Sequence, residues 1–213
     1  MTKTSPEYRN ARAQVLLIAA ITGACVAVDA MLYVVLPIHW REAELTSLWQ
    51  VGILLSLNRL VRLPVNPLAG WCFSKASAKT LVVTACLLGV GVALGYTAAK
   101  GFLLWSALRV TWGIAWSFLK LGGLFTVMNV ADDSNRGRLM GLYTGTYRLG
   151  SLVGMLGGAI VADIWGLRVA CMCGVALSLM ATALALFRLR KKPARQTHAG
   201  EKKSIPWLDF IRS

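Results

Sequence analysis

Six long apolar segments recur along the chain, and they constrain its fold more than any other feature. An α-helix needs about 20 predominantly apolar residues to cross a bilayer, and each segment is near that length. Because backbone polar groups find no water in the hydrocarbon core, only helices and closed barrels span it. We therefore predict an all-α membrane protein with six transmembrane helices joined by short loops. The predicted spans are 14–37, 48–69, 80–98, 102–128, 139–162 and 167–187.

The positive charge of the chain is distributed unevenly between the two ends of these spans. The net charge of +14 by itself would be compatible with nucleic-acid binding. However, 15 of the 23 Lys and Arg residues fall in the amino terminus, two alternate loops and the carboxy-terminal tail, and only Arg41, Lys100 and Arg168 fall in the opposite loops. This is the positive-inside pattern. We expect an inner-membrane protein with both termini in the cytoplasm and no nucleic-acid partner.

Three regions follow from this distribution. Residues 1–13 form a cytoplasmic amino terminus, 14–187 the transmembrane bundle, and 188–213 a basic linker or tail. The cations of the tail can lie beside anionic headgroups, so membrane lipids are expected partners. Its last residues, with Trp207, Leu208 and Ile211, can form the apolar face of a short surface helix.

Five cations and one acid, Asp29, lie inside the apolar segments. A cation at mid-bilayer costs about 2.5–3.5 kcal/mol on insertion scales, so it usually faces a cavity or a partner. A carboxylate or phosphate substrate can offset the surplus of positive charge through bidentate contacts to arginine. We therefore predict a small anionic or zwitterionic organic solute as the substrate. The cations are Arg59, Arg62, Arg109, Lys120 and Arg148.

The fourth segment places Arg109, Gly113, Trp116 and Lys120 on one helical stripe. Cations beside an aromatic ring can bind an anion that also has an apolar body. Trp116 therefore joins the five cations as a predicted substrate-binding residue. Two alternatives stay open: Arg59, Arg62 and Lys120 can extend to the headgroups, and Arg109 can form a structural ion pair with Asp29.

Asp29 is the predicted proton-coupling group. A neighbouring arginine keeps a carboxylate ionised, whereas burial favours its neutral form, and the arrival of a substrate could tip that balance.

No pattern in the chain indicates an enzyme, a metal site or a cofactor. The five cysteines are interpreted as small buried hydrophobes, since no Cys/His cluster has metal-ligand spacing. No nucleophile has an adjacent base and no carboxylates are paired.

Four motifs resemble the amino-terminal half of a major facilitator superfamily transporter, closest to its proton-coupled exporters. Arg109-x-x-x-Gly113 resembles the fourth-helix arginine motif, and the run from Gly150 through Gly154 to Gly157-Gly158 is similar to the exporters' fifth-helix motif. Asn135-Arg-Gly-Arg-Leu-Met-Gly141 matches the usual entry to that helix, and 70–79 occupies the place of the signature loop. The chain departs from the family at Met155 (usually proline), Ser74 (usually aspartate) and Ser77 (usually glycine).

The resemblance implies half of a transporter with inverted three-helix (3+3) repeats, working with a second six-helix half. That half would be a second copy of this chain or a separate chain, and transport would be proton-coupled efflux. The alternative is a six-helix membrane scaffold or regulatory subunit without transport of its own. Glycines four apart also let helices approach closely. The predicted packing or gating glycines are Gly70, Gly113, Gly150, Gly154, Gly157 and Gly158.

Overall fold

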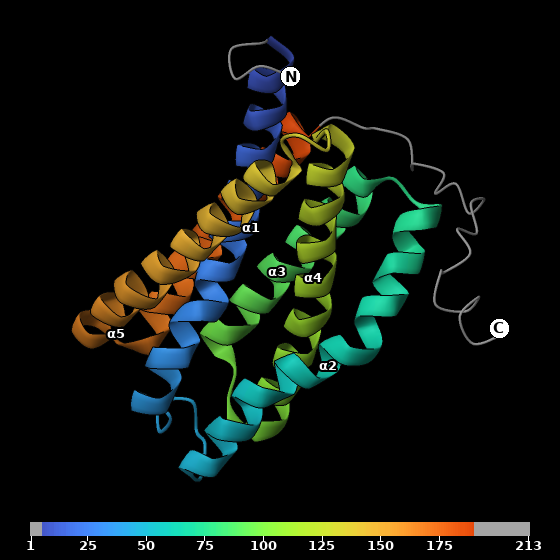
Figure 1. Ribbon diagram of the computed structural model, residues 1–213. Coiled ribbons are helices and arrows are strands. Elements are labelled where there is room, and N and C mark those ends of the chain that lie inside the picture. Colours follow the sequence, from blue (N-terminus) through green and yellow to red (C-terminus); the bar gives the residue numbers. More distant parts are fainter. Residues whose placement is uncertain (1–5, 190–213) are drawn as a thin grey trace, which may run out of the picture.

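The computed structural model describes residues 6–189, and all regular structure within them is helical (Figure 1). The helices are α1 (Pro6–Ile38), α2 (Leu48–Lys75), α3 (Ala78–Ala98), α4 (Gly101–Val130) and α5 (Arg136–Arg188). The surface helix predicted around Trp207, Leu208 and Ile211 lies outside the described residues.

Four of these helices, α1, α3, α4 and α5, are long and apolar enough to cross a membrane. The remaining helix, α2, falls short on composition, because its apolar sequence is interrupted by four polar residues: Asn58, Arg59, Arg62 and Asn66. A helix that carries such side chains needs protein neighbours or water to solvate them. The fold is that of an integral membrane protein with one polar helix.

Two helices, α1 and α2, extend furthest beyond their predicted spans. The first predicted span began at residue 14, whereas α1 begins at Pro6, whose fixed φ suits a first helical position. Helix α2 continues through Gly70 to Lys75 instead of ending at 69. The connection to α3 is short because Ser77 caps that helix, its hydroxyl accepting from the Thr80 N–H at 3.2 Å. Gly70 is therefore helical.

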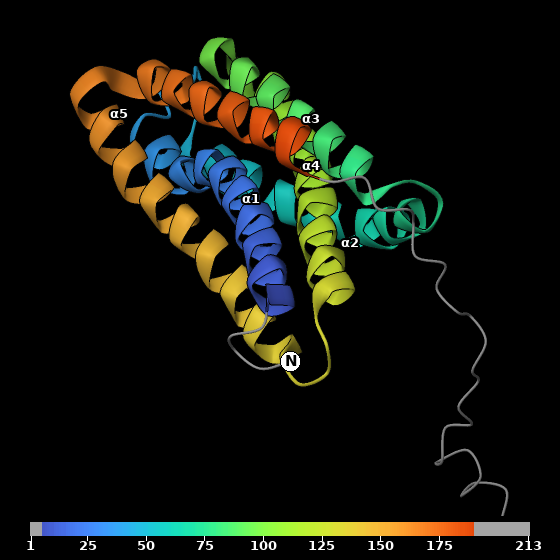
Figure 2. The ribbon, with the colours of Figure 1, turned by 90° about the horizontal axis from the view of Figure 1, so that it is seen from above.

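Helix α5 doubles back on itself at Gly166, which separates two arms (Figures 1 and 2). Gly166 has φ 83° and ψ 170°, a conformation available to glycine and strained for other residues. The next residue, Leu167, donates its N–H to Glu42 Oε2 at 3.1 Å. Glu42, in the α1–α2 connection, thus satisfies an otherwise unpaired donor at the start of the second arm. The arms cover the two segments predicted at 139–162 and 167–187.

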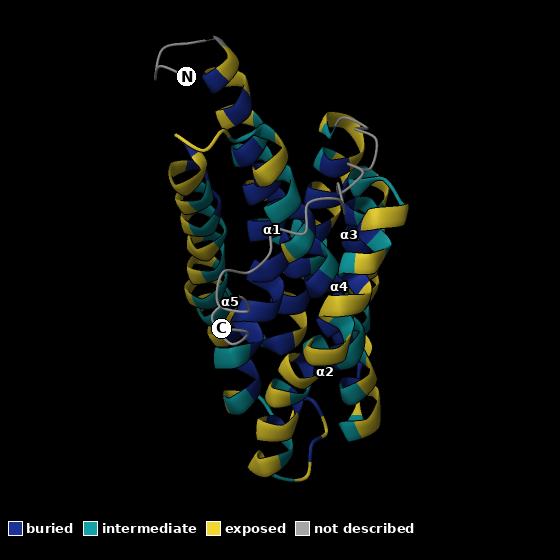
Figure 3. Cartoon of the chain, turned by 45° about the vertical axis from the view of Figure 1, so that its right-hand side comes forward, coloured by how far each residue is buried: buried dark blue, intermediate teal, exposed yellow. Residues whose placement is uncertain are grey.

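Helix α1 is the most buried element, and both arms of α5 pack against it (Figure 3). The first arm approaches closely because it presents glycine where the helices meet. A Cβ at Gly150 would lie 2.7 Å from Gly23 Cα, and one at Gly154 would lie 2.3 Å from Ala27 O. Gly158 faces Met31 in the same way.

The remaining predicted glycines divide into two kinds. Gly113 permits a close approach of α2 to α4, since a Cβ there would lie 2.8 Å from Asn58 O. Gly70 and Gly157 have no atom of the described chain within 4 Å of a Cβ position. Within this chain, then, the glycine seam consists of Gly150, Gly154 and Gly158.

Helix α2 bends along its length and lies mainly against α4 (Figure 1). Pro64 and Pro67 lie inside the helix, and each removes a backbone donor and disfavours straight geometry.

Replacing Gly154 by alanine is expected to destabilise the bundle, because the new methyl would meet the backbone of α1. Overpacking of this kind costs about 1–3 kcal/mol, or about 2–4 °C in Tm for each kcal/mol in a chain of this size. Thermal unfolding in detergent measures the effect. Gly157→Ala is the matched control, and equal Tm losses for the two variants would contradict the assigned seam.

The Glu42 cap predicts a dependence of stability on pH. His39 Nδ1 lies 2.6 Å from Glu42 Oε1, and this contact is the main reason that the pKa of Glu42 lies below its usual value. Burial raises this pKa, whereas the hydrogen bond from the Leu167 N–H lowers it further. The stabilisation is present above the unfolded pKa and is lost as the pH falls through the lowered pKa. Since Glu42 is half exposed, we expect Glu42→Gln to remove only about 1–2 °C of the acid-induced fall in Tm. A Tm–pH curve identical to that of the wild type would show that the cap contributes nothing.

Candidate functional site

A buried ion pair joins α1 to α4. Asp29 Oδ1 accepts from Arg109 Nη1, and the two residues are 5% and 0% exposed. Arg109 Nε also donates to Leu54 O of α2 at 3.2 Å. The structure thus shows the ion pair that was one of two alternatives for Arg109. Burying two charges is tolerated only where attraction and additional hydrogen bonds offset their desolvation.

The pair continues into α2 through an amide. Asn58 is fully buried; its Nδ2 donates to Asp29 Oδ1 at 3.0 Å, and its Oδ1 accepts from Arg62 Nη2 at 2.5 Å. An amide can donate and accept at once, so Asn58 links the carboxylate to a second guanidinium. One side chain therefore connects the hydrogen bonds of Arg62 and Asp29.

Two aromatic rings hold the guanidinium groups in place. The Cζ atoms of Arg59 and Arg109 lie 5.3 and 5.5 Å from the centroid of the Tyr33 ring. Arg62 Cζ lies 5.4 Å from the centroid of the Trp116 ring. Such contacts stabilise a cation by about 0.5–2 kcal/mol, more where water is excluded. The rings position the cations without neutralising them.

The aromatic surface extends from α4 onto α5. Trp116 meets Tyr147 edge-on at 5.8 Å between centroids, Tyr147 lies 5.2 Å from Tyr143, and Trp112 lies 6.5 Å from Trp116. Of these residues, Tyr147 is half-buried and the others are buried. The arrangement joins Arg62 to a row of rings contributed by two helices.

Several buried polar atoms of this region have no partner in hydrogen-bonding geometry: Arg62 Nε, Arg109 Nη2, Tyr96 OH and Trp112 Nε1. The Tyr96 hydroxyl lies beside the Arg109 guanidinium, close enough to interact electrostatically. Buried donors of this kind usually bind water or a ligand. Arg62 Nε is the one that belongs to the guanidinium over Trp116.

The structure brings some predicted site residues together and leaves others apart. Arg109 is paired with Asp29, and Arg62, which lies over Trp116, is linked to Asp29 through Asn58. Arg59 is exposed and lies over the Tyr33 ring that Arg109 also contacts, whereas Lys120 and Arg148 are exposed and outside this network. Lys120 is exposed although Gly123 and Val127, further along α4, are buried. Its backbone carbonyl accepts from the Tyr143 hydroxyl at 3.5 Å.

Sequence analysis did not assign Tyr33, Asn58 or Tyr147 to the site. Tyr33 follows Asp29 by four residues and Asn58 precedes Arg62 by four, so helical spacing was the available signal. In the described part of the chain, no group of three His, Cys, Asp or Glu side chains could hold a metal ion.

The comparison with known families agrees with this architecture. A family model described as Major Facilitator Superfamily matches residues 16–213, which is most of the chain. No curated protein matches at a significant level. The matched family is one of membrane transporters rather than enzymes. With a match of this extent on an all-helical fold of apolar helices, the chain belongs to the Major Facilitator Superfamily.

Proposed function

We propose that the chain forms half of a transporter for a small anionic or zwitterionic organic solute. One observation carries this proposal: the guanidinium groups of Arg59, Arg62 and Arg109 belong to one contact network that contains a single carboxylate, Asp29. After Arg109 is paired with Asp29, two positive charges remain in the cluster. In a membrane-embedded protein this surplus favours a ligand that brings negative charge.

Arg62 is the group best placed to receive the anionic end of the solute. One of its terminal nitrogens is bound to Asn58, and its Nε is buried without a partner. The guanidinium lies over Trp116, whose ring meets Tyr147. A carboxylate or phosphate at Arg62 would place an apolar body against these rings, while Arg59 adds long-range attraction.

Asp29 is the proposed proton-coupling group. In the structure it accepts hydrogen bonds from both Arg109 and Asn58. An anion at Arg62 competes with Asn58 for that guanidinium, so Asn58 can transmit substrate arrival to Asp29. Protonation of Asp29 would release Arg109 and weaken the link between α1 and α4. Outward transport is supported by the resemblance of the fifth-helix motif to that of exporters.

A second six-helix half would complete the pathway. With the two arms of α5 as separate crossings, the chain would cross the inner membrane six times, in two inverted repeats. Both of its termini would then lie in the cytoplasm. Support comes from the exposed apolar side chains of the first arm, including Leu149, Leu152 and Leu156, and from the open position of Gly157. Lys120 and Arg148 stay proposed members of a site that this second half would enclose.

Reconstitution into liposomes tests this function. Uptake of labelled carboxylates and phosphate monoesters is compared with that of neutral amide analogues, and the mass of the detergent complex reports whether the partner is a second copy. We expect flux of at least one anion class and none of its neutral analogue. A stable complex with an unrelated membrane protein, without flux of any panel member, would instead support the scaffold alternative.

Arg62→Gln is expected to raise the apparent KM for the transported anion about tenfold, because it removes one charge-assisted contact of about 1.4 kcal/mol. Arg62→Lys should recover only part of the affinity, since lysine keeps the charge but lacks the planar fork. Liposome uptake over a range of solute concentrations gives both values. Arg41→Gln, which removes an exposed guanidinium stacked on Trp40, is the matched control. An unchanged KM in Arg62→Gln would exclude this residue from recognition.

Asp29→Asn alone is expected to cost about 3–5 kcal/mol of stability, because it leaves Arg109 buried and unpaired. The double variant Asp29→Asn/Arg109→Gln removes both charges and should recover much of that loss. If Asp29 couples transport to protons, uptake by the double variant will no longer depend on the pH gradient. Tm and uptake at two pH gradients are the measurements, and a folded double variant with wild-type pH dependence would assign coupling to another group.

A further inference from the structure

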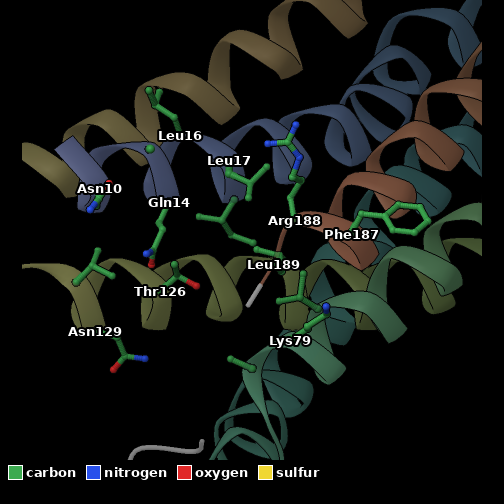
Figure 4. A pocket seen from close by; sticks show the side chains of 15 residues that line it. Asn10, Gln14, Leu16, Leu17, Lys79, Thr126, Asn129, Phe187, Arg188 and Leu189 are labelled. Carbon is green, nitrogen blue, oxygen red and sulfur yellow. The ribbon is translucent and has the colours of Figure 1, made fainter. Parts of the chain in front are cut away.

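A cavity separate from the arginine cluster lies at one end of the bundle. It is formed where α1 and α3 begin and where α4 and α5 end (Figure 4). Its volume is about 920 Å³, within the range of small-molecule sites. The proposed transport mechanism uses none of its side chains.

The polar lining of this cavity is cationic and neutral. Lys79 of α3 and Arg188 of α5 provide the charges, and no acidic residue of the described chain lines the cavity. Asn10 and Gln14 of α1 and Thr126 and Asn129 of α4 add uncharged polar groups. Gln14 projects from α1 toward Thr126 across the cavity (Figure 4). Two cations with amide donors and no competing carboxylate favour an anion that accepts several hydrogen bonds.

Lys79 is held in position by the end of α5. Its Nζ donates to Leu186 O at 2.7 Å, one of the last carbonyls of that helix, which have no partner within the helix. An ammonium has three N–H donors, so this bond leaves two for a ligand. The side chain is only half-exposed. The cation is therefore placed before any ligand arrives.

The other walls are apolar, and the cavity opens to the surface of the molecule. Leu16 and Leu17 of α1 line one side, Leu189 another, and Phe187 at the rim is 85% exposed. Basic pockets between transmembrane helices beside an anionic leaflet bind lipid headgroups.

We propose that this cavity binds the phosphate group of an anionic phospholipid, with the phosphate at Lys79 and Arg188 and an acyl chain along Leu16, Leu17 and Phe187. The shared chemistry is a phosphate group, which free phosphate could also supply. The apolar wall and the open rim favour the lipid. The site is independent of the solute pathway, so it stands even if the proposed transport function fails.

Native mass spectrometry of the full chain tests this proposal. The protein is delipidated in detergent and exchanged with phosphatidylglycerol or phosphatidylcholine. We expect the wild type to retain phosphatidylglycerol about tenfold more than phosphatidylcholine, and Lys79→Gln/Arg188→Gln to lose that preference. Because Lys79 also contacts α5, Arg188→Gln alone is measured as well; its side chain is exposed, and it should lose part of the preference.

Lys75→Gln is the matched control. Lys75 is an exposed cation at the end of α2, on the same end of the bundle, and does not line the cavity. An equal loss of phosphatidylglycerol in Lys75→Gln, or full retention in the double variant, would overturn the proposal. Inorganic phosphate is titrated in parallel. If inorganic phosphate stabilises the wild type but not the double variant and displaces the lipid, the phosphate site is upheld with free phosphate as its occupant. If inorganic phosphate does neither, retention of phosphatidylglycerol identifies the lipid headgroup as the occupant.

Discussion

The ion pair between Asp29 and Arg109 sets the requirements that its surroundings must meet. Two charges removed from water inside an apolar bundle need additional hydrogen bonds that help to offset their desolvation. Helix α2 supplies two of those bonds, through the carbonyl of Leu54 and the amide of Asn58. The most polar helix is thereby attached to the most buried one through a carboxylate at the centre of the site.

Glycine at the helix contacts makes this arrangement possible. Gly113 allows the backbone of α2 near Asn58 to approach α4, which carries Arg109. On the other side of α1, Gly150 and Gly154 bring the first arm of α5 against Gly23 and Ala27. In a membrane, where apolar helices gain little from avoiding lipid, such close packing is a main source of association. The position of the charges therefore depends on residues that have no side chain.

Sequence patterns predicted the apolar helices and the ion pair as one of two alternatives for Arg109. For Lys120 they left two alternatives, substrate binding and extension to the headgroups, because a helical stripe gives the direction of a side chain but not which neighbouring side chains cover it. Asn58 and Tyr33 were missed for a related reason. Each contacts residues of another helix: Tyr33 lies beside Arg109, and Asn58 binds Asp29 in addition to Arg62 of its own helix. Helix-to-helix register is set by packing, which one-dimensional periodicity does not contain.

The helix that bears Arg59 and Arg62 has the fewest neighbours in the bundle. Helix α2 rests mainly on α4 and barely meets α1 or α3, and it contains Pro64 and Pro67. The other four helices pack closely together, and α1 is the most buried of them. Leu54 and Asn58 hold the part of α2 before Pro64 against Arg109 and Asp29, so a bend at the prolines would move only the part of the helix that follows them. The molecule thus combines a closely packed group of helices with one sparsely packed helix, and that helix carries Arg59 and Arg62.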